Sequence, residues 1–245
     1  MSALVPFDPE PASGGGRDRF PTTRLSLLAN AEHSRPALAA LAELYWKPVY
    51  KHLRLKWRLT NEDAEELTQA SFAEMISANW LAKFDSGRGT FRTYLRTCVD
   101  GLVLDHREAA RRLKRGGGST AVSLDFASAE RELAWADPGP APDEVFECEW
   151  RREVLFRAIA DLRSFSGQSG CPERFEIFAA YDLADASGRP SYDELAARYS
   201  LPVTQVTNHL AWARRQLRRL ALERIESTAA SRHEARADAR KIFGG

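Results

Sequence analysis

The sequence predicts an all-α protein of two helical domains joined by a flexible linker, with a helix-turn-helix in the C-terminal domain. Apolar residues recur at the three-and-four spacing of helices in most segments between 37 and 220. A Gly- and Pro-rich stretch divides these helices into two blocks. Ser191–Leu220 then has the pattern of a short helix, a tight turn and a longer helix. The expected parts are an arm at 1–21, a domain at 22–115, a linker at 116–142, a second domain at 143–222 and an extension at 223–245.

The composition is that of a globular protein: 245 residues, 44% hydrophobic and 28% charged. There is no apolar run of membrane-spanning length and no signal peptide, so we expect a cytoplasmic protein without membrane insertion. The three cysteines, Cys98, Cys148 and Cys171, lie far apart, and we expect neither disulfides nor a structural zinc, and no cofactor. Because the net charge is only +1, any nucleic-acid affinity must come from local segregation of charge, and the chain alone should bind DNA weakly.

The N-terminal part begins with an arm and two helices. Residues 1–21 have several Pro and Gly residues and no periodic apolar pattern, which fits a disordered arm. A short helix is expected from Thr22 or Thr23, either of which can serve as its N-cap. A long helix follows at about 37–59, and Pro48 inside it predicts a kink or a local restart.

A second long helix is expected from its N-cap, Asn61, to about residue 79. Glu62, Asp63 and Glu65 favour the start of this helix because they lie in its first turn. The acidic exposed side is a poor ligand for DNA and suits a basic protein partner, although such a patch is equally often only solvated surface.

The stretch Asp85–Arg115 joins a loop with the sequence DSGRG to one amphipathic helix. Its apolar face comprises Phe91, Tyr94, Leu95, Cys98, Leu102, Ala109 and Leu113. Its cationic side comprises Arg92, Arg96, Arg107, Arg111 and Lys114. A helix laid along a phosphate backbone needs both faces, with aromatic residues at its start to meet bases. A charge run is also usual on a merely solvated helix, so the stretch alone leaves both interpretations open. Asp100 puts an anion on the side that is proposed to face the strand.

The segment 116–142 is expected to be a linker, part of which lies against a protein surface. Four of its residues are too apolar for a fully solvated tether: Leu124, Phe126, Leu133 and Trp135. Helices are then expected from Asp143 to about Ser164 and from Glu173 to Asp182.

The C-terminal helix pair carries the second informative pattern. Ser191 and Glu194 form the Ser-x-x-Glu pattern of a capping box, and an apolar stripe from Val203 to Leu220 marks the longer helix. Side chains that read base edges or hold phosphates lie opposite or beside that stripe: Thr204, Gln205, Asn208, His209, Arg214, Arg215 and Arg218. The pattern favours DNA binding in the major groove, although other helical hairpins imitate it. The extension 223–245 is expected to prolong the helix and to end in a mobile tail.

Together these parts resemble bacterial RNA polymerase sigma factors of the extracytoplasmic-function group, over about residues 36–222. The family's polymerase-binding helix, commonly DAEDLVQETF, resembles NEDAEELTQASFAEMI. Its next segment, commonly FRTWLYRIARNLALDHLRRRRR, resembles FRTYLRTCVDGLVLDHREAARRLKR. Its final domain, commonly SYEEIAELLGISVGTVKSRLHRARRRL, resembles SYDELAARYSLPVTQVTNHLAWARRQLRRL.

The resemblance implies a role for each part. The residues that would contact the polymerase are Asp63, Glu66, Leu67, Gln69 and Phe72. The loop 85–90 and the following helix would hold the melted minus-ten strand, through Phe91, Arg92, Tyr94, Arg96, Arg107, Arg111, Arg112, Lys114 and Arg115. The seven polar residues of the second helix pair, named above, would bind the minus-thirty-five duplex. The implied partners are core RNA polymerase, promoter DNA as duplex and as melted strand, and an anti-sigma factor.

Two other classes of protein compete with this hypothesis. A helix-turn-helix regulator that binds duplex DNA without polymerase explains Ser191–Leu220, but leaves the acidic helix without a task. A nuclease that uses Glu62, Asp63 and Glu66 on a metal is disfavoured, because the sequence has no motif for a metal site, a phosphate-binding loop or a nucleophile. We therefore expect a protein that is not an enzyme.

Overall fold

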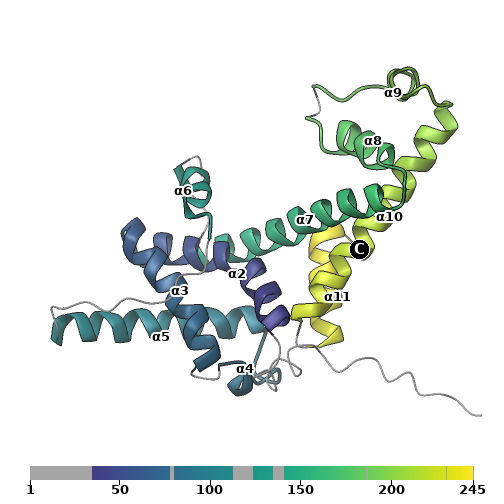
Figure 1. The fold of residues 1–245 in the computed structure, drawn as a ribbon. Helices are drawn as coiled ribbons and strands as arrows, with labels where there is room; N and C mark the ends of the chain where they lie inside the picture. Colours follow the sequence, from purple (N-terminus) through teal and green to yellow (C-terminus); the bar gives the residue numbers. More distant parts are fainter. Residues whose placement is uncertain are drawn as a thin grey trace, which may run out of the picture.

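A computed structural model of the chain describes residues 35–77, 80–112, 124–134, 141–185, 187–229 and 231–244, and among these residues helices are the only regular secondary structure (Figure 1). The prediction of an all-α fold is confirmed. The helices are α2 (Arg35–Lys56), α3 (Asn61–Ser77), α4 (Trp80–Lys83), α5 (Phe91–Arg112), α6 (Phe126–Ala134), α7 (Pro142–Gln168), α8 (Glu173–Asp182), α9 (Tyr192–Tyr199), α10 (Val203–Thr228) and α11 (Arg232–Phe243). The arm at 1–21 and the short helix expected after it lie outside the described residues.

Helix α2 is the centre of the first hydrophobic core. Its apolar side chains, among them Leu41, Tyr45 and Val49, are almost fully buried against α3, α5 and α7. The helix passes through Pro48 without an interruption, so the expected restart does not occur. Burial on nearly all sides holds the helix together across a residue that cannot donate its backbone hydrogen bond.

The N-cap of α3 is Thr60 rather than Asn61. The Thr60 Oγ1 atom accepts a hydrogen bond from the backbone N–H of Asp63 at 3.1 Å, which is the capping contact. Asn61 is already helical, and its side chain accepts from the Tyr50 hydroxyl instead. The cap prediction was therefore one residue too late, since a nearby tyrosine competes for the Asn61 amide.

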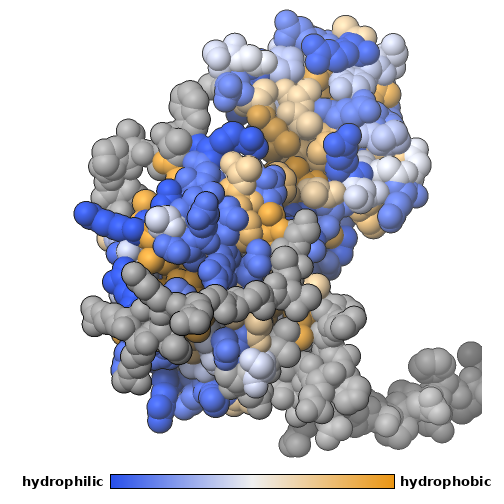
Figure 2. Space-filling view, turned by 60° about the vertical axis from the view of Figure 1, so that its left-hand side comes forward, coloured by the Kyte–Doolittle hydropathy of each residue, from blue (hydrophilic) through white to orange (hydrophobic). Residues whose placement is uncertain are grey.

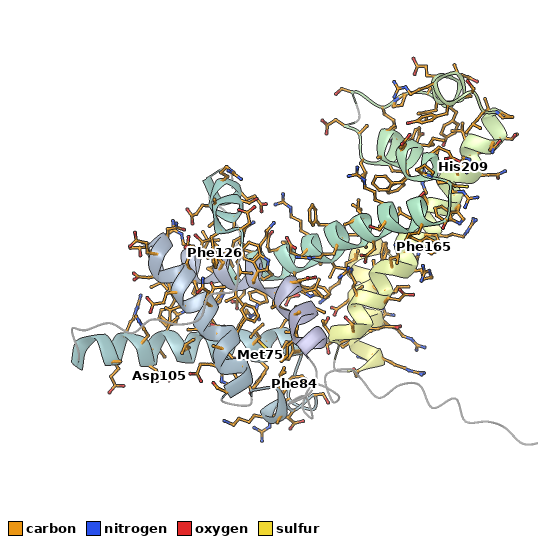
Figure 3. The ribbon with its side chains drawn as sticks, in the orientation of Figure 1. Met75, Phe84, Asp105, Phe126, Phe165 and His209 are labelled. Carbon is orange, nitrogen blue, oxygen red and sulfur yellow. The ribbon has the colours of Figure 1, made fainter. Side chains whose placement is uncertain are left out.

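Helix α6 lies within the segment that was expected to be a linker. Phe126 (Figure 3) is 7% exposed, and its ring packs edge-on against Trp46 with the ring centroids 5.5 Å apart. The Glu130 carboxylate accepts hydrogen bonds from Tyr50 and Arg54 of α2. The expectation that part of this segment lies against a surface is confirmed, but that part is an ordered helix, which the sequence pattern did not predict.

Helices α7 and α10 are long (Figure 1), and each contributes side chains to two hydrophobic cores. Trp150 and Val154 of α7 and Ile225 of α10 pack with the α2–α5 core. Leu162 of α7 and Leu210 of α10 pack instead with α8 and α9 in a second, smaller core. α7 also runs to Gln168, beyond its expected end, so the separation between the cores falls within two continuous helices.

The end of the chain forms a capped helix rather than a mobile tail. Ser231 accepts a hydrogen bond from the Glu234 N–H at 3.1 Å and so starts α11. Ala235, Asp238 and Ala239 are buried against the first core, and α11 lies beside the C-terminal half of α10 (Figure 1). The prediction that residues after 222 extend the preceding helix is confirmed by α10, whereas the predicted mobile end is wrong.

Helices α9 and α10 are joined by only three residues, Ser200 to Pro202. The predicted capping box of α9 is confirmed, because Ser191 Oγ accepts from the Glu194 N–H and the Glu194 carboxylate accepts from the Ser191 N–H. Ser200 ends α9 in the left-handed conformation, with φ of 54°. A short αL turn therefore sets the angle at which α10 leaves α9.

Candidate nucleic-acid interface

The first residue of α5, Phe91, is part of the core. Its ring is 1% exposed and packs edge-on against Tyr45 and Phe84, with centroids 5.5 and 5.4 Å away. A base cannot stack on a ring that is covered on these sides. In this structure Phe91 positions the start of α5, and the expectation that it contacts the melted strand does not hold.

Arg92 is also buried, and it is surrounded by three residues from α7 and α11. Its Nη1 and Nη2 atoms donate to the two carboxylate oxygens of Asp238 at 2.9 and 2.7 Å. Its Nε donates to Glu147 at 3.0 and 3.1 Å, and its guanidinium lies 4.0 Å from the centroid of the Trp150 ring. We call these four residues the Arg92 cluster. Burial acts to lower the pKa of Arg92, but the Tyr45 oxygen and the two carboxylates outweigh it and raise that pKa, so the guanidinium stays charged.

Tyr94 and Arg96 are only partly accessible. The Tyr94 hydroxyl donates to the Trp80 carbonyl at 2.9 Å. The Arg96 Nη1 donates to the Asp143 carbonyl at 3.2 Å, and its guanidinium lies 5.6 Å from the Phe146 ring centroid. Arg96 thus meets the first turn of α7, as Arg92 meets the next turns.

The loop 85–90 and the far end of α5 are open to solvent. Asp85 accepts from the Gly87 N–H at 2.9 Å, and Gly89 adopts a φ of 149°, a conformation that favours glycine. Arg107 is exposed, donates to the Trp57 carbonyl at 3.0 Å, and has its guanidinium 4.8 Å from the Trp57 ring centroid. The side chains of Arg111 and Arg112, and all of Lys114 and Arg115, lie outside the described residues.

Asp100 is a structural acceptor rather than an unpaired anion. Its carboxylate accepts from Trp57 Nε1 at 2.6 Å and from Lys56 Nζ at 2.7 Å. Its Oδ1 also lies 2.9 Å from Nε2 of His52, a side chain with no exposed surface. Partial burial acts to raise the pKa of Asp100, but these three partners lower it overall. Asp100 therefore orients the Trp57 ring on which Arg107 stacks.

The acidic face of α3 is exposed, as a docking surface requires. Asp63 and Glu66 are exposed, and Gln69 and Phe72 are partly exposed beside them. Leu67 is 3% exposed and belongs to the core, so its expected polymerase contact does not fit this structure. Hydrophilic side chains cover much of the face drawn in Figure 2, with apolar patches between them.

On α10 the expected DNA-binding residues divide into two groups. Six of these residues are exposed: Thr204, Gln205, Asn208, Arg214, Arg215 and Arg218, with the Arg218 guanidinium 5.4 Å from the centroid of the Phe243 ring of α11. His209 is 6% exposed and lies where α10 meets α8 (Figure 3), and burial together with Arg174 lowers its pKa. Arg214 binds both oxygens of Asp182 at 2.9 Å. Because His209 is buried it cannot reach a base, and the Arg214 guanidinium is paired with Asp182 of α8. Both residues therefore support the packing of α10 on α8.

The sequence patterns did not point to Trp57, Glu147 or Asp238. Trp57 has the spacing of an ordinary core residue, and only the tertiary contact with α5 places it beside Arg107. Asp238 follows Arg92 by 146 residues, a separation that no local periodicity spans.

Within the described residues, no group of three or more His, Cys, Asp or Glu side chains could hold a metal ion. In the same part of the chain, no helix combines the length and apolar character needed to cross a membrane.

Comparison with known families identifies the helices that carry this surface. Residues 41–113, which cover α3, α4, α5 and most of α2, match the family described as Sigma-70 region 2. This match supports a factor of the sigma-70 family that acts in RNA polymerase binding and promoter melting. No curated protein and no solved structure matches the chain significantly.

Proposed function

We propose that the chain is a sigma factor of the extracytoplasmic-function group. It binds core RNA polymerase in the cytoplasm and directs promoter recognition, DNA melting and transcription initiation. The observation that carries the proposal is that residues 41–113, the segment similar to Sigma-70 region 2, place an exposed acidic helix, α3, beside the cationic helix α5.

Each exposed surface has a task in this proposal. The acidic face of α3, with Asp63 and Glu66 at its centre, binds a basic surface of the polymerase. The loop 85–90 and the cationic side of α5, including Arg107, hold the melted minus-ten strand. Helices α9 and α10 act as a helix-turn-helix, in which Thr204, Gln205 and Asn208 face base edges of the minus-thirty-five duplex. Arg215 and Arg218 hold its phosphates. An anti-sigma factor is the expected inhibitor.

The decisive test is co-purification of the full chain with core RNA polymerase, followed by run-off transcription on a promoter library. The double variant Asp63→Lys, Glu66→Lys should lose polymerase binding, because it reverses two charges on the docking face. Glu226→Lys, at an exposed position on α10, is the control and should bind as the native chain does.

Failure of the native chain to bind core polymerase would remove the proposal. Binding of duplex DNA without polymerase would then favour the helix-turn-helix regulator, and magnesium-dependent cleavage of DNA would favour the nuclease.

A further inference from the structure

The two carboxylates of the Arg92 cluster both come from outside the segment similar to Sigma-70 region 2. Glu147 lies on α7 and Asp238 on α11, whereas Arg92 lies in the first turn of the cationic helix α5. The contacts are buried: Arg92 is 2% exposed and Asp238 1% exposed. Two later parts of the chain therefore close over one cation of the surface that was expected to hold DNA.

Carboxylate oxygens occupy the positions on Arg92 that phosphate oxygens would need. An arginine offers its donors in a fixed planar fork, and the Nε, Nη1 and Nη2 atoms of Arg92 all donate to Glu147 or Asp238. Trp150 covers the plane of the guanidinium at 4.0 Å. As long as α7 and α11 stay in place, Arg92 can bind neither a phosphate nor a base.

The neighbouring cation is covered in the same way. Arg96 donates to the Asp143 carbonyl at 3.2 Å, and its Nη1 lies 3.7 Å from the Asp143 carboxylate. Phe146 of α7 lies against its guanidinium. The acidic first turns of α7 thus lie against the cationic first turns of α5.

Helix α11 is the part of this cover that can leave at least cost. It is a single helix of 12 residues next to the end of the chain, linked to α10 through residues 229–231. Its buried apolar residues are Ala235 and Ala239, with Ile242 and Phe243 only partly buried, so it buries little apolar surface. Removal of the Asp238 carboxylate would leave the buried Arg92 charge without this partner, so that change should favour release of α11.

We propose that α11, together with the beginning of α7, is an intramolecular latch that closes the strand-binding surface of α5 through Asp238. In the free chain Arg92 is held by residues of the same chain, and release of α11 frees its Nη1 and Nη2 atoms for a phosphate of the melted promoter strand. The effect on DNA rests on the function proposed above, whereas the closure itself does not.

The test uses the full chain with Asp238→Asn, which keeps the shape of the side chain and removes its charge. Glu226→Gln is the matched control, because it changes the net charge equally at an exposed position on α10. Hydrogen exchange of the α11 amides reports release of the latch, and fluorescence anisotropy with a single-stranded promoter oligonucleotide reports strand binding. The apparent dissociation constant falls by the factor by which the open fraction rises, so we expect at least roughly tenfold tighter binding for Asp238→Asn.

The outcomes separate the latch from the proposed function. Faster α11 exchange with tighter strand binding, seen for Asp238→Asn and not for Glu226→Gln, supports the latch. Faster exchange with unchanged strand affinity, or unchanged exchange in the variant, overturns it. If Asp238→Asn does not fold, hydrogen exchange of the native chain is measured with and without core polymerase. Binding of the polymerase should accelerate exchange of the α11 amides. Continued protection of these amides in a complex that opens promoters overturns the latch. Failure of the native chain to bind polymerase removes the sigma function, and the exchange data on Asp238→Asn still decide the closure.

Discussion

Removal of the Asp100 carboxylate should destabilise the protein by about 2–4 kcal/mol, although this residue lies on the surface that was expected to face DNA. Asp100→Ala takes away the acceptor of Trp57 Nε1, a loss of about 1 kcal/mol. It also leaves His52 without a partner at Nε2, and the His52 Nδ1 already has none within the described residues. An unsatisfied buried polar group costs about 1–3 kcal/mol. Lys56 adds little, because its side chain is 39% exposed and can be rehydrated.

Urea unfolding at pH 7.5, followed by circular dichroism, measures this effect with two matched variants. Asp100→Asn keeps an oxygen acceptor for Trp57 or His52 and should cost about 1 kcal/mol. Asp105→Ala, an exposed position on α5 (Figure 3), carries the same gain in helix propensity without the lost contacts and should stay within about 0.5 kcal/mol of the native chain. If Asp100→Ala unfolds at the same urea concentration as Asp105→Ala, the assignment of Asp100 as a structural acceptor is wrong.

Three further predictions follow from packing, titration and the α10 surface. Phe126→Ala should lower the free energy of unfolding by about 3–5 kcal/mol, since it leaves a cavity between α6 and α2. A loss below about 1 kcal/mol in urea unfolding would argue against an ordered α6. Burial lowers the pKa of both His52 and His209 in the folded state, so around and below pH 6.5 the unfolded chain binds more protons than the folded chain. The free energy of unfolding should therefore fall between pH 7 and pH 5, by at most about 1.4 kcal/mol per pH unit for each histidine, and His209→Gln should reduce this slope. A free energy of unfolding that is flat or rises on acidification would contradict this prediction. In anisotropy titrations of minus-thirty-five duplexes, Asn208→Ala should reduce the binding free energy by about 1–3 kcal/mol for one duplex sequence only. Arg215→Ala should weaken binding to all duplex sequences and reduce the slope of log affinity against log salt concentration by about 1. The opposite result for the two variants would exclude the proposed orientation of α10.

Local patterns were sufficient for most helices. The span Glu173–Asp182 and the Ser191–Glu194 capping box agree with the structure, since these features depend on neighbouring residues alone. Helix α6 was missed because its nine residues lie between Gly- and Pro-rich runs, and its contacts with α2 stabilise it from outside. The cap of α3 was misplaced for a similar reason, as Tyr50 engages the Asn61 side chain.

The candidate site was harder to predict than the helices, because accessibility depends on partners far away in the sequence. The spacing of α5 correctly places Phe91 and Leu95 on an apolar face, but it cannot show that Arg92 is buried as well. The burial of His209 could not be predicted from spacing either, since it depends on the packing of α10 against α8. Residues with the right chemistry for DNA were therefore found readily, whereas only the tertiary structure separates exposed residues from structural ones.

Long-range ion pairs reduce the positive potential on the surface of the folded chain. The cations of α2 and α5 face the acidic side of α7: Lys47 pairs with Glu153, Lys51 with Glu149, and Arg92 with Glu147, at 3.0, 2.6 and 3.0 Å. Each pair neutralises a charge that would otherwise attract phosphate, so the closed chain presents less positive potential than its sequence of arginines and lysines suggests. The expectation that the free chain binds DNA weakly therefore depends on where the carboxylates lie as well as on their number. A partner that separates α7 and α11 from α5 would restore that potential at the surface that we propose binds the melted strand.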